Sequence, residues 1–460
     1  MHILWIKTEL LHPVDKGGKI RTYNMLKELK RNNRITYLTL DDGVASASER
    51  SSASEYAHEV VCVPFQPRQK FTPGFYGELL VNLFSSLPYA IRKYQSAQLR
   101  RQISDRAKSV DLVVCDFLAP AANVPRNLAC PTVLFQHNVE AVIWKRHYEV
   151  QSNFLKKAYL FTQWLKMRGF ERRMCRQFDA VVAVSKEDCE QMHNDYGIEA
   201  VFEVPTGVDT NFFRPGGKEK TAEHNIVFTG SMDWLPNEDA INYFTGEILP
   251  RIKQKIPDVT LTVVGRNPYP SLLELAKKDP AVVVTGRVDD VRPYMERAAA
   301  YVVPLRIGGG TRLKIYEAMA MEKAIVSTTI GAEGLPVENG TELVLADAAE
   351  DFATAVVKVL ADQAFASELG AKAAATVRQN FGWQQVAERF AAICEQVAPK
   401  VGARHAVPRH TQAPAPKVGA RHAVPLHMRT HTPKVGARHA VPVSTEAQAV
   451  PGPSSLIETS

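Results

Sequence analysis

Short apolar runs alternate with longer stretches of helical periodicity along most of the chain. A strand that is buried on both faces of a parallel sheet reads as an unbroken apolar run, and a helix returns the chain to the next strand. The alternation therefore predicts an α/β fold with two Rossmann-like parallel sheets. The first sheet is expected to take its strands from residues 2–6, 35–40, 59–63, 112–115, 132–136 and 180–184, and the second from 226–229, 260–264, 282–285, 300–303, 324–327 and 342–345.

Changes in composition divide the chain into four parts. The first domain is predicted to span residues 1–205 and the second 206–382, and a helix at 383–398 follows. From residue 399 to 460 the decapeptide PKVGARHAVP occurs three times with a period of 17 residues. Its valines and alanines are too few for a core, so this part is predicted to be a disordered repeat tail. Metal or polyanion binding by the histidines and arginines of the repeat is the alternative.

A glycine-rich segment between Tyr301 and Thr328 carries the clearest chemical signal. An apolar strand leads there into three glycines, a threonine, two cations and a helix, in the sequence YVVPLRIGGGTRLKIYEAMA. Glycines let backbone N–H groups approach an anion, and the helix N-terminus adds partial positive charge. Arg312 and Lys314 supply two full charges, and Glu317 can accept hydrogen bonds from vicinal hydroxyls. The segment predicts a diphosphate cradle. The alternative is a glycine-rich turn that caps an ordinary helix.

With these residues the chain resembles a known family, the group 1 glycosyltransferases of GT-B fold, over residues 1 to about 397. These enzymes retain the anomeric configuration, use nucleoside diphosphate sugars and build polysaccharides and glycolipids. The resemblance places the ribose-binding second glutamate of the family's Glu-x7-Glu motif at Glu317 and the first at Gly309. Many members carry an Arg and a Lys after the first strand of the second domain, and the segment TGSMDW lacks them. The positive charge is therefore expected from Arg312 and Lys314.

The resemblance also assigns roles outside this segment. Gly17 and Gly18, which follow the first strand, are expected to meet the phosphate and sugar of the donor. His137 stands where family members carry a histidine, and we expect it to contact the donor sugar. Glu140 is a further candidate for acceptor positioning or base work, and backbone groups around Val288 are expected to bind the nucleobase. From local sequence alone, the glycines also fit an ordinary βα turn, and a single histidine is more often structural.

Together these residues predict transfer of a glycosyl group from a nucleoside diphosphate sugar to the hydroxyl of a glycan or lipid-linked acceptor. The first domain is expected to hold the acceptor and the second the donor, and the helix at 383–398 to return to the first domain. Cations would stabilise the leaving diphosphate, and no carboxylate is identifiable as a nucleophile. The expected catalytic residues are His137, Arg312 and Lys314, and the expected donor-binding residues are Gly17, Gly18, Gly308, Gly309, Gly310, Thr311, Val288 and Glu317. A sugar-nucleotide epimerase of the same fold and a non-catalytic nucleotide-sugar-binding protein are the alternatives.

The composition is that of a globular protein and limits the expected partners. The net charge is +7, with 45% hydrophobic and 23% charged residues among 460. Much of the positive excess lies in the repeat tail, so nucleic-acid binding is not expected. Six cysteines are scattered without ligand spacing, which predicts reduced thiols in a cytoplasmic protein with no metal and no cofactor besides the co-substrate.

Membrane contact, if present, is expected to be peripheral. No apolar run reaches the length of about 20 residues that a spanning helix needs. Residues 71–91 are aromatic and aliphatic, and residues 145–173 alternate basic with aromatic side chains. Such stretches suit the inner face of a membrane and a lipid-linked acceptor. The alternative is that both are core helices with solvated basic faces.

Overall fold

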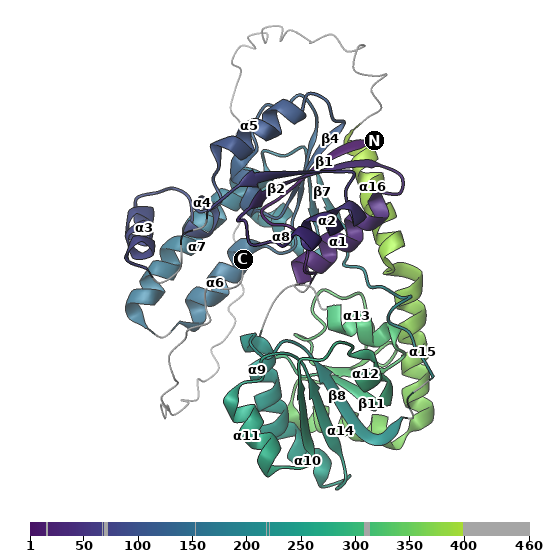
Figure 1. Cartoon of the computed structure of the whole chain (residues 1–460). Coiled ribbons are helices and arrows are strands. Elements are labelled where there is room, and N and C mark those ends of the chain that lie inside the picture. Colours follow the sequence, from purple (N-terminus) through teal and green to yellow (C-terminus); the bar gives the residue numbers. More distant parts are fainter. Residues whose placement is uncertain are drawn as a thin grey trace, which may run out of the picture. The chain divides into compact units, whose positions relative to one another are not determined.

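Two parallel sheets form the framework of the protein. The computed structural model describes residues 1–14, 17–66, 68, 72–151, 153–217, 219, 221–307 and 313–398 (Figure 1). The first sheet has the strand order β3-β2-β1-β4-β5-β6-β7 and the second β10-β9-β8-β11-β12-β13. Neighbouring strands are parallel in both. The predicted α/β class with two Rossmann-like sheets is confirmed, and the predicted repeat tail lies outside the described residues.

The first sheet is covered by helices on both faces. Side chains of β1 alternate between two hydrophobic clusters, with Leu4 and Ile6 in one and Ile3 and Trp5 in the other. This alternation explains why the strand reads as a continuous apolar run. The strands are β1 (His2–Lys7), β2 (Arg34–Asp41), β3 (Glu59–Pro64), β4 (Leu112–Asp116), β5 (Thr132–Phe135), β6 (Ala180–Ala183) and β7 (Val201–Glu203). The helices are α1 (Gly17–Leu29), α2 (Ala47–Ser51), α3 (Pro73–Leu83), α4 (Tyr89–Arg92), α5 (Ala97–Arg106), α6 (Glu140–Val150), α7 (Phe154–Cys175) and α8 (Lys186–Tyr196).

The second sheet and its helices share one hydrophobic core. Its strands are β8 (Ala222–Thr229), β9 (Thr260–Val264), β10 (Val282–Gly286), β11 (Ala298–Val303), β12 (Ala324–Ser327) and β13 (Val344–Leu345). The helices in this half are α9 (Leu235–Tyr243), α10 (Leu249–Lys253), α11 (Pro270–Lys278), α12 (Arg292–Arg297), α13 (Leu313–Ala320), α14 (Ala349–Ala361) and α15 (Gln363–Asn380), and α16 (Trp383–Val397) ends the described chain.

Each sheet has one place where the order of its strands reverses. In the first sheet β1 lies between β2 and β4, so the chain leaves β1 in one direction first and returns to its other side later. In the second sheet β8 lies in the same way between β9 and β11. Ligands of open parallel sheets bind beyond the carboxyl ends of the strands at such a point. The topology therefore predicts ligand-binding residues at the carboxyl ends of β1 and β4 and of β8 and β11.

The last helix, α16, packs against the first sheet although it follows the second in sequence. Phe390 contacts Trp5 of β1 and Phe135 of β5, with ring centroids 5.5 and 5.0 Å apart. The segment after β7 also meets the start of this helix, because an added Cβ at Gly207 would lie 2.6 Å from the Trp383 ring. Only a glycine fits this contact.

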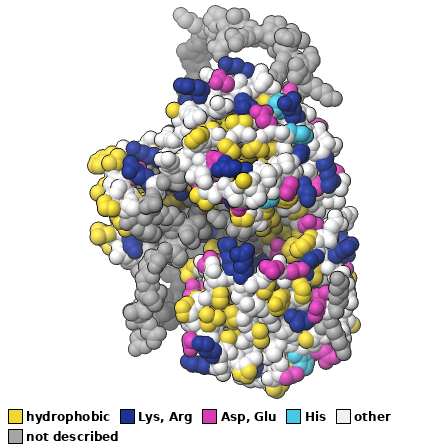
Figure 2. All heavy atoms as spheres, in the orientation of Figure 1, with side chains coloured by type: hydrophobic (Ala, Val, Ile, Leu, Met, Phe, Trp, Pro, Cys, Tyr) yellow, Lys and Arg dark blue, Asp and Glu magenta, His cyan; other side chains and the backbone are white. Residues whose placement is uncertain are grey.

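The described helices give no sign of a membrane span. None of them, within the residues that the structure describes, combines the length and the apolar character that crossing a bilayer requires. The face drawn in Figure 2 carries charged side chains of both signs.

The contact at Gly207 leads to a stability prediction with a matched control. Gly207→Ala should lower the free energy of unfolding by about 1–3 kcal/mol, because the new methyl group overlaps the Trp383 ring. Gly169→Ala in α7 meets open space and should raise it by about 0.5–1 kcal/mol, since alanine favours the helix. Thermal unfolding followed by circular dichroism measures both. Equal melting temperatures for the two variants would contradict the packing described here.

Candidate active site

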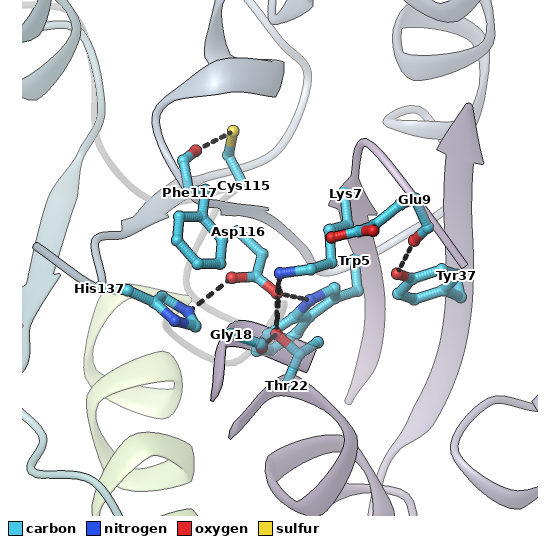
Figure 3. Close-up of polar contacts among 10 residues, drawn as sticks. All are labelled: Trp5, Lys7, Glu9, Gly18, Thr22, Tyr37, Cys115, Asp116, Phe117 and His137. Atoms are coloured by element: carbon cyan, nitrogen blue, oxygen red, sulfur yellow. Dashed lines mark hydrogen bonds and ion pairs between the residues drawn. The ribbon is translucent and has the colours of Figure 1, made fainter. Parts of the chain in front are cut away.

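A buried carboxylate occupies the carboxyl end of β4, at the point where the first sheet reverses its strand order (Figure 3). Asp116 is fully buried. Its Oδ2 accepts hydrogen bonds from Trp5 Nε1 at 3.0 Å, Lys7 Nζ at 3.1 Å and Thr22 Oγ1 at 2.6 Å. Trp5 and Lys7 belong to β1, and Thr22 to α1. The carboxylate therefore joins the two switch-point strands to the helix that follows the first of them.

His137 lies on the other side of the same carboxylate. Its Nε2 is 2.8 Å from Asp116 Oδ1, at ion-pair distance but without the alignment of a full hydrogen bond. Burial lowers the pKa of the imidazole to about 3, and the neighbouring carboxylate offsets only part of this effect. The imidazole is therefore neutral at ordinary pH. A neutral imidazole can donate or accept a hydrogen bond with a sugar hydroxyl without placing a charge next to the sugar.

The Lys7 ammonium is the counter-charge of Asp116. Burial acts to raise the pKa of Asp116, but the Lys7 ammonium, together with hydrogen bonds to the carboxylate, outweighs burial and holds this pKa below its ordinary value. Burial lowers the pKa of Lys7, and Asp116 opposes that shift. Because His137 is neutral, Lys7 supplies the positive charge. A buried ion pair of this kind is costly to form and costly to break, so it fixes local geometry more than it adds stability.

Phe117 connects this group to the start of α1. Its φ is +73°, a left-handed conformation that is rare for a residue other than glycine and that occurs preferentially at functional sites. Its ring stacks on His137 with centroids 3.8 Å apart and lies 4.1 Å from Lys7 Nζ. An added Cβ at Gly18 would be only 2.8 Å from this ring. The structure thus brings Gly18 and His137 together around Phe117, and the close approach requires glycine.

The start of α1 also meets the start of α13 in the second half of the chain. A Cβ placed on Gly17 would lie 3.9 Å from Leu313 Cδ1. Leu313 is the first described residue after the glycine-rich loop. The loop residues of the sequence prediction, Gly308, Gly309, Gly310, Thr311 and Arg312, lie outside the described residues. The contact nevertheless places the two ends of the predicted donor site, Gly17 and the beginning of α13, next to each other.

Lys314 lies at the switch point of the second sheet. Its Nζ donates a 2.8 Å hydrogen bond to Asn237 Oδ1 of α9 and lies 4.1 Å from the Phe228 ring of β8. Gly230 follows β8, and a Cβ there would be 2.8 Å from Lys314 Nζ. The lysine therefore extends across the carboxyl end of β8. A cation at this place suits the predicted phosphate contact.

The other predicted residues of the second half take different positions. Glu317 is half-buried one turn after Lys314, and burial raises its pKa to about 7 while Lys314 opposes the shift. Val288 follows β10 and packs, partly buried, against the core of the second sheet. Glu317 and Lys314 thus belong to one group, whereas no described contact joins Val288 to them.

The surroundings of the Glu140 carboxyl do not suit a general base in the unliganded protein. Its backbone N–H donates to Glu171 Oε1 at 2.9 Å, at the start of α6. Burial and, to a smaller extent, the neighbouring Glu171 carboxylate raise the pKa of the Glu140 carboxyl to about 8. A carboxyl group that keeps its proton at neutral pH accepts no proton from an acceptor hydroxyl.

Comparison with known proteins decides the family. Residues 16–212 match the model described as Glycosyltransferase Family 4, and residues 223–362 match the one described as Glycosyl transferases group 1. The chain belongs to the group 1 glycosyltransferases. The resemblance predicted from the sequence is confirmed, and the protein is an enzyme that transfers sugars.

Solved structures place this glycosyltransferase in the GT-B fold. A sucrose-phosphate synthase from Thermosynechococcus elongatus matches with a TM-score of 0.62 and 16% identity, over 86% of this chain and 98% of that one. TarM matches with a TM-score of 0.61 and 12% identity, over 85% of this chain and 98% of that one. At these identities the likeness concerns the fold alone.

Two relatives illustrate the breadth of the family. A 44.6 kDa protein in the cps region of Klebsiella pneumoniae is 22% identical over 396 residues, which cover 84% of this chain and 97% of the relative. A phosphatidyl-myo-inositol mannosyltransferase of Mycobacterium tuberculosis is 28% identical over 244 residues, or 50% of this chain and 63% of the relative.

Two residues at the candidate site of this glycosyltransferase, Asp116 and Arg266, belong to no sequence motif that would have predicted them. Asp116 is the last residue of β4, directly after an apolar run, and Arg266 is the second residue after the apolar strand β9. Arg266 Nε donates a 2.8 Å hydrogen bond to Ser231 Oγ in the loop after β8. It thus brings a cation to the loop in which the family's Arg and Lys are absent. Both residues could have been found in the sequence as charged side chains at or just after the end of a strand at the switch point, or of the strand next to it. Within the described residues no cluster of His, Cys, Asp or Glu could hold a metal ion.

The ion pair of Asp116 and Lys7 can be tested by its effect on stability. Asp116→Asn should lower the free energy of unfolding by about 3–5 kcal/mol, because it leaves the Lys7 ammonium buried without a counter-charge. Asp105→Asn, on an exposed carboxylate, should change it by less than about 0.5 kcal/mol. Adding Lys7→Met to Asp116→Asn should restore part of the loss in urea unfolding. A double variant less stable than Asp116→Asn alone would contradict the pairing.

Proposed function

We propose that this glycosyltransferase is a retaining enzyme of the hexosyltransferase type. It moves a sugar from a nucleoside diphosphate sugar to the hydroxyl of a glycan or lipid-linked acceptor, in polysaccharide or glycolipid assembly. Structural neighbours support the donor class, since HepE of Anabaena is described in complex with UDP-glucose. The acceptor class is supported by the phosphatidyl-myo-inositol mannosyltransferase and by the relative from a cps region. The absence of ligand spacing among its cysteines favours the cytoplasm, where we place the enzyme.

The observation that carries the proposal is the position of Lys314 and Glu317 at the switch point of the second sheet. Lys314 extends over the end of β8, and Glu317 follows on the same helix. Their separation lets a cation face a diphosphate while a carboxyl accepts hydrogen bonds from a ribose. The loop of Gly308, Gly309, Gly310, Thr311 and Arg312 immediately precedes this helix in sequence. We therefore assign donor binding to this loop and to α13.

The proposed chemistry relies on stabilising the leaving diphosphate. As the bond to the sugar breaks, negative charge grows on the phosphate oxygens, and Lys314 and Arg312 would offset it. Arg266 adds a third cation beside the loop after β8. We expect retention by a same-face displacement, in which the leaving phosphate helps to deprotonate the acceptor hydroxyl. No metal ion is needed in this scheme because the cations are side chains.

The first domain would hold the sugar and the acceptor. Gly17 lies next to the start of α13, and Gly18 and His137 pack around Phe117. We assign to the neutral His137 imidazole a hydrogen bond with the transferring sugar, oriented by Asp116. Backbone groups near Val288 are assigned to the nucleobase. Positioning of this kind lowers the barrier because both reactants are held in reach of each other.

The proposal is tested by incubating the purified protein with a panel of nucleoside diphosphate sugars and candidate acceptors. Release of nucleoside diphosphate that depends on the acceptor supports it. Formation of a sugar epimer without release would indicate an epimerase, and binding without turnover would indicate a non-catalytic protein. Either result would overturn the proposed reaction.

Lys314 should contribute directly to nucleotide affinity. Lys314→Ala is expected to weaken binding of a nucleoside diphosphate by about 1.5–3 kcal/mol, the range of a charge-assisted hydrogen bond. Titration calorimetry measures the change, and Arg312→Ala should act in the same direction. Lys277→Ala, at an exposed lysine of α11, is the matched control and should leave the affinity unchanged. An unaltered affinity in Lys314→Ala would remove the central residue of the donor site.

Glu317 should make nucleotide binding depend on pH. Burial raises its pKa to about 7 in the free protein, and the ribose hydroxyls require the ionised carboxylate as acceptor. The affinity should therefore rise about tenfold between about pH 6 and about pH 8. At the higher pH the carboxyl is already ionised in the free protein, so binding need not displace its proton. Glu317→Gln should lose this part of the dependence, while ionisation of the nucleotide itself remains in both proteins. The same pH profile in both proteins would show that Glu317 does not contact the ribose.

A further inference from the structure

A group of large exposed apolar side chains occurs at the end of α3 and in the first turn of α7. We call it the apolar tip and define it by five residues with large exposed fractions. These are Leu80 (64%), Val81 (57%), Phe84 (94%), Phe154 (79%) and Leu155 (76%). Figure 2 shows hydrophobic side chains next to basic ones in the region that α3 occupies at the left of Figure 1. Single exposed apolar residues are ordinary, but exposed groups of this size mark interaction sites.

The exposed stripe of α7 changes in character along the helix. Phe154, Phe161 and Leu165 are exposed at 79%, 39% and 46% and follow one another at helical spacing. Farther along the same stripe come Arg168 and Arg172, both exposed. Residues at these intervals lie on one side of a helix. One face therefore offers apolar groups at its beginning and cations toward its end.

The charge of α7 is strongly one-sided. Its sequence FLKKAYLFTQWLKMRGFERRMC contains six basic residues and one acidic residue. The acidic residue is Glu171, which is fully buried and accepts hydrogen bonds from the start of α6 and from Tyr196. It therefore leaves the exposed basic side chains without compensation from their own helix. Lys156 is exposed directly beside the apolar tip.

The end of α3 is held in place by polar contacts with α7. Gln163 Nε2 donates to Asn82 Oδ1 at 3.0 Å, and both side chains are fully buried. Lys166 Nζ donates to the carbonyl oxygens of Asn82 and Leu83 at 2.7 and 3.1 Å. The apolar tip is thus presented by anchored helices, and its exposure is a property of the packed structure.

We propose that the apolar tip and the basic residues of α7 bind the surface of an anionic lipid bilayer. Apolar side chains can enter the boundary between headgroups and acyl chains, while the cations face anionic headgroups. The positive charge of α7 favours an anionic bilayer over a second copy of the chain, because a second copy would bring like charges together. The residues involved are separate from those assigned to the donor, so this inference and the proposed reaction can fail independently.

The test measures binding of the full-length protein to sedimented vesicles. One set of vesicles contains neutral phosphatidylcholine, and the other contains phosphatidylcholine mixed with anionic phosphatidylglycerol. The protein should bind the anionic set more tightly, and added salt should weaken that binding. Phe154→Ser with Leu155→Ser, and separately Arg168→Gln with Arg172→Gln, should each reduce the affinity about tenfold or more.

Matched controls separate vesicle binding by the apolar tip from nonspecific binding and from binding by the basic repeat tail, which every variant retains. Val44→Ser with Leu273→Ser removes exposed apolar groups elsewhere, and Arg100→Gln with Arg101→Gln removes exposed cations of α5. Both should bind vesicles like the unaltered protein. The proposal is overturned if the unaltered protein ignores anionic vesicles, or if tip and control variants bind alike. It is also overturned if the tip variants dissociate an oligomer in gel filtration and leave vesicle binding unchanged.

Discussion

Both sheets are parallel and covered by packed side chains, and this constraint decides where charge can occur. A charged group inside such a core would lose its hydration without compensation. The ends of the strands are the places where polar side chains can leave the core, and the switch points bring the ends of non-consecutive strands together. Lys7, Asp116 and His137 meet at one of these points, and Lys314 occupies the other. The site thus follows from the topology of the sheets.

The two switch points use charge in different ways. In the first sheet the Asp116 carboxylate balances Lys7, and a neutral imidazole lies beside this pair. In the second sheet the Lys314 ammonium donates a hydrogen bond to the neutral amide of Asn237. The Lys314 ammonium would attract an anionic donor to the carboxyl end of β8.

Much of the fold was predictable from the chain because apolar runs reveal buried strands. All twelve predicted strands occur, with ends shifted by a few residues. The missed strand, β7, has only three residues, none of them fully buried, and lies at the edge of the sheet. It gives no apolar run to detect. Helix α16 begins at Trp383 and ends at Val397, compared with predicted bounds of 383–398.

The candidate site was only partly predictable, because its geometry depends on contacts between distant segments. The sequence pattern and the family resemblance pointed to Lys314, Glu317 and His137. Asp116 was not predicted, because its carboxylate is recognisable only from its contacts with side chains of β1, α1 and the loop after β5. The need for glycine at position 18 comes from the Phe117 ring, almost a hundred residues away in sequence. No local pattern encodes such a contact, since it exists only when the sheet has formed.

The most direct test of this account is a crystal structure of the protein with a bound nucleoside diphosphate. We expect the diphosphate beyond the carboxyl ends of β8 and β11, within hydrogen-bonding distance of Lys314, and the ribose at Glu317. A nucleotide bound at the amino ends of the strands, or on a surface away from α13, would contradict the account.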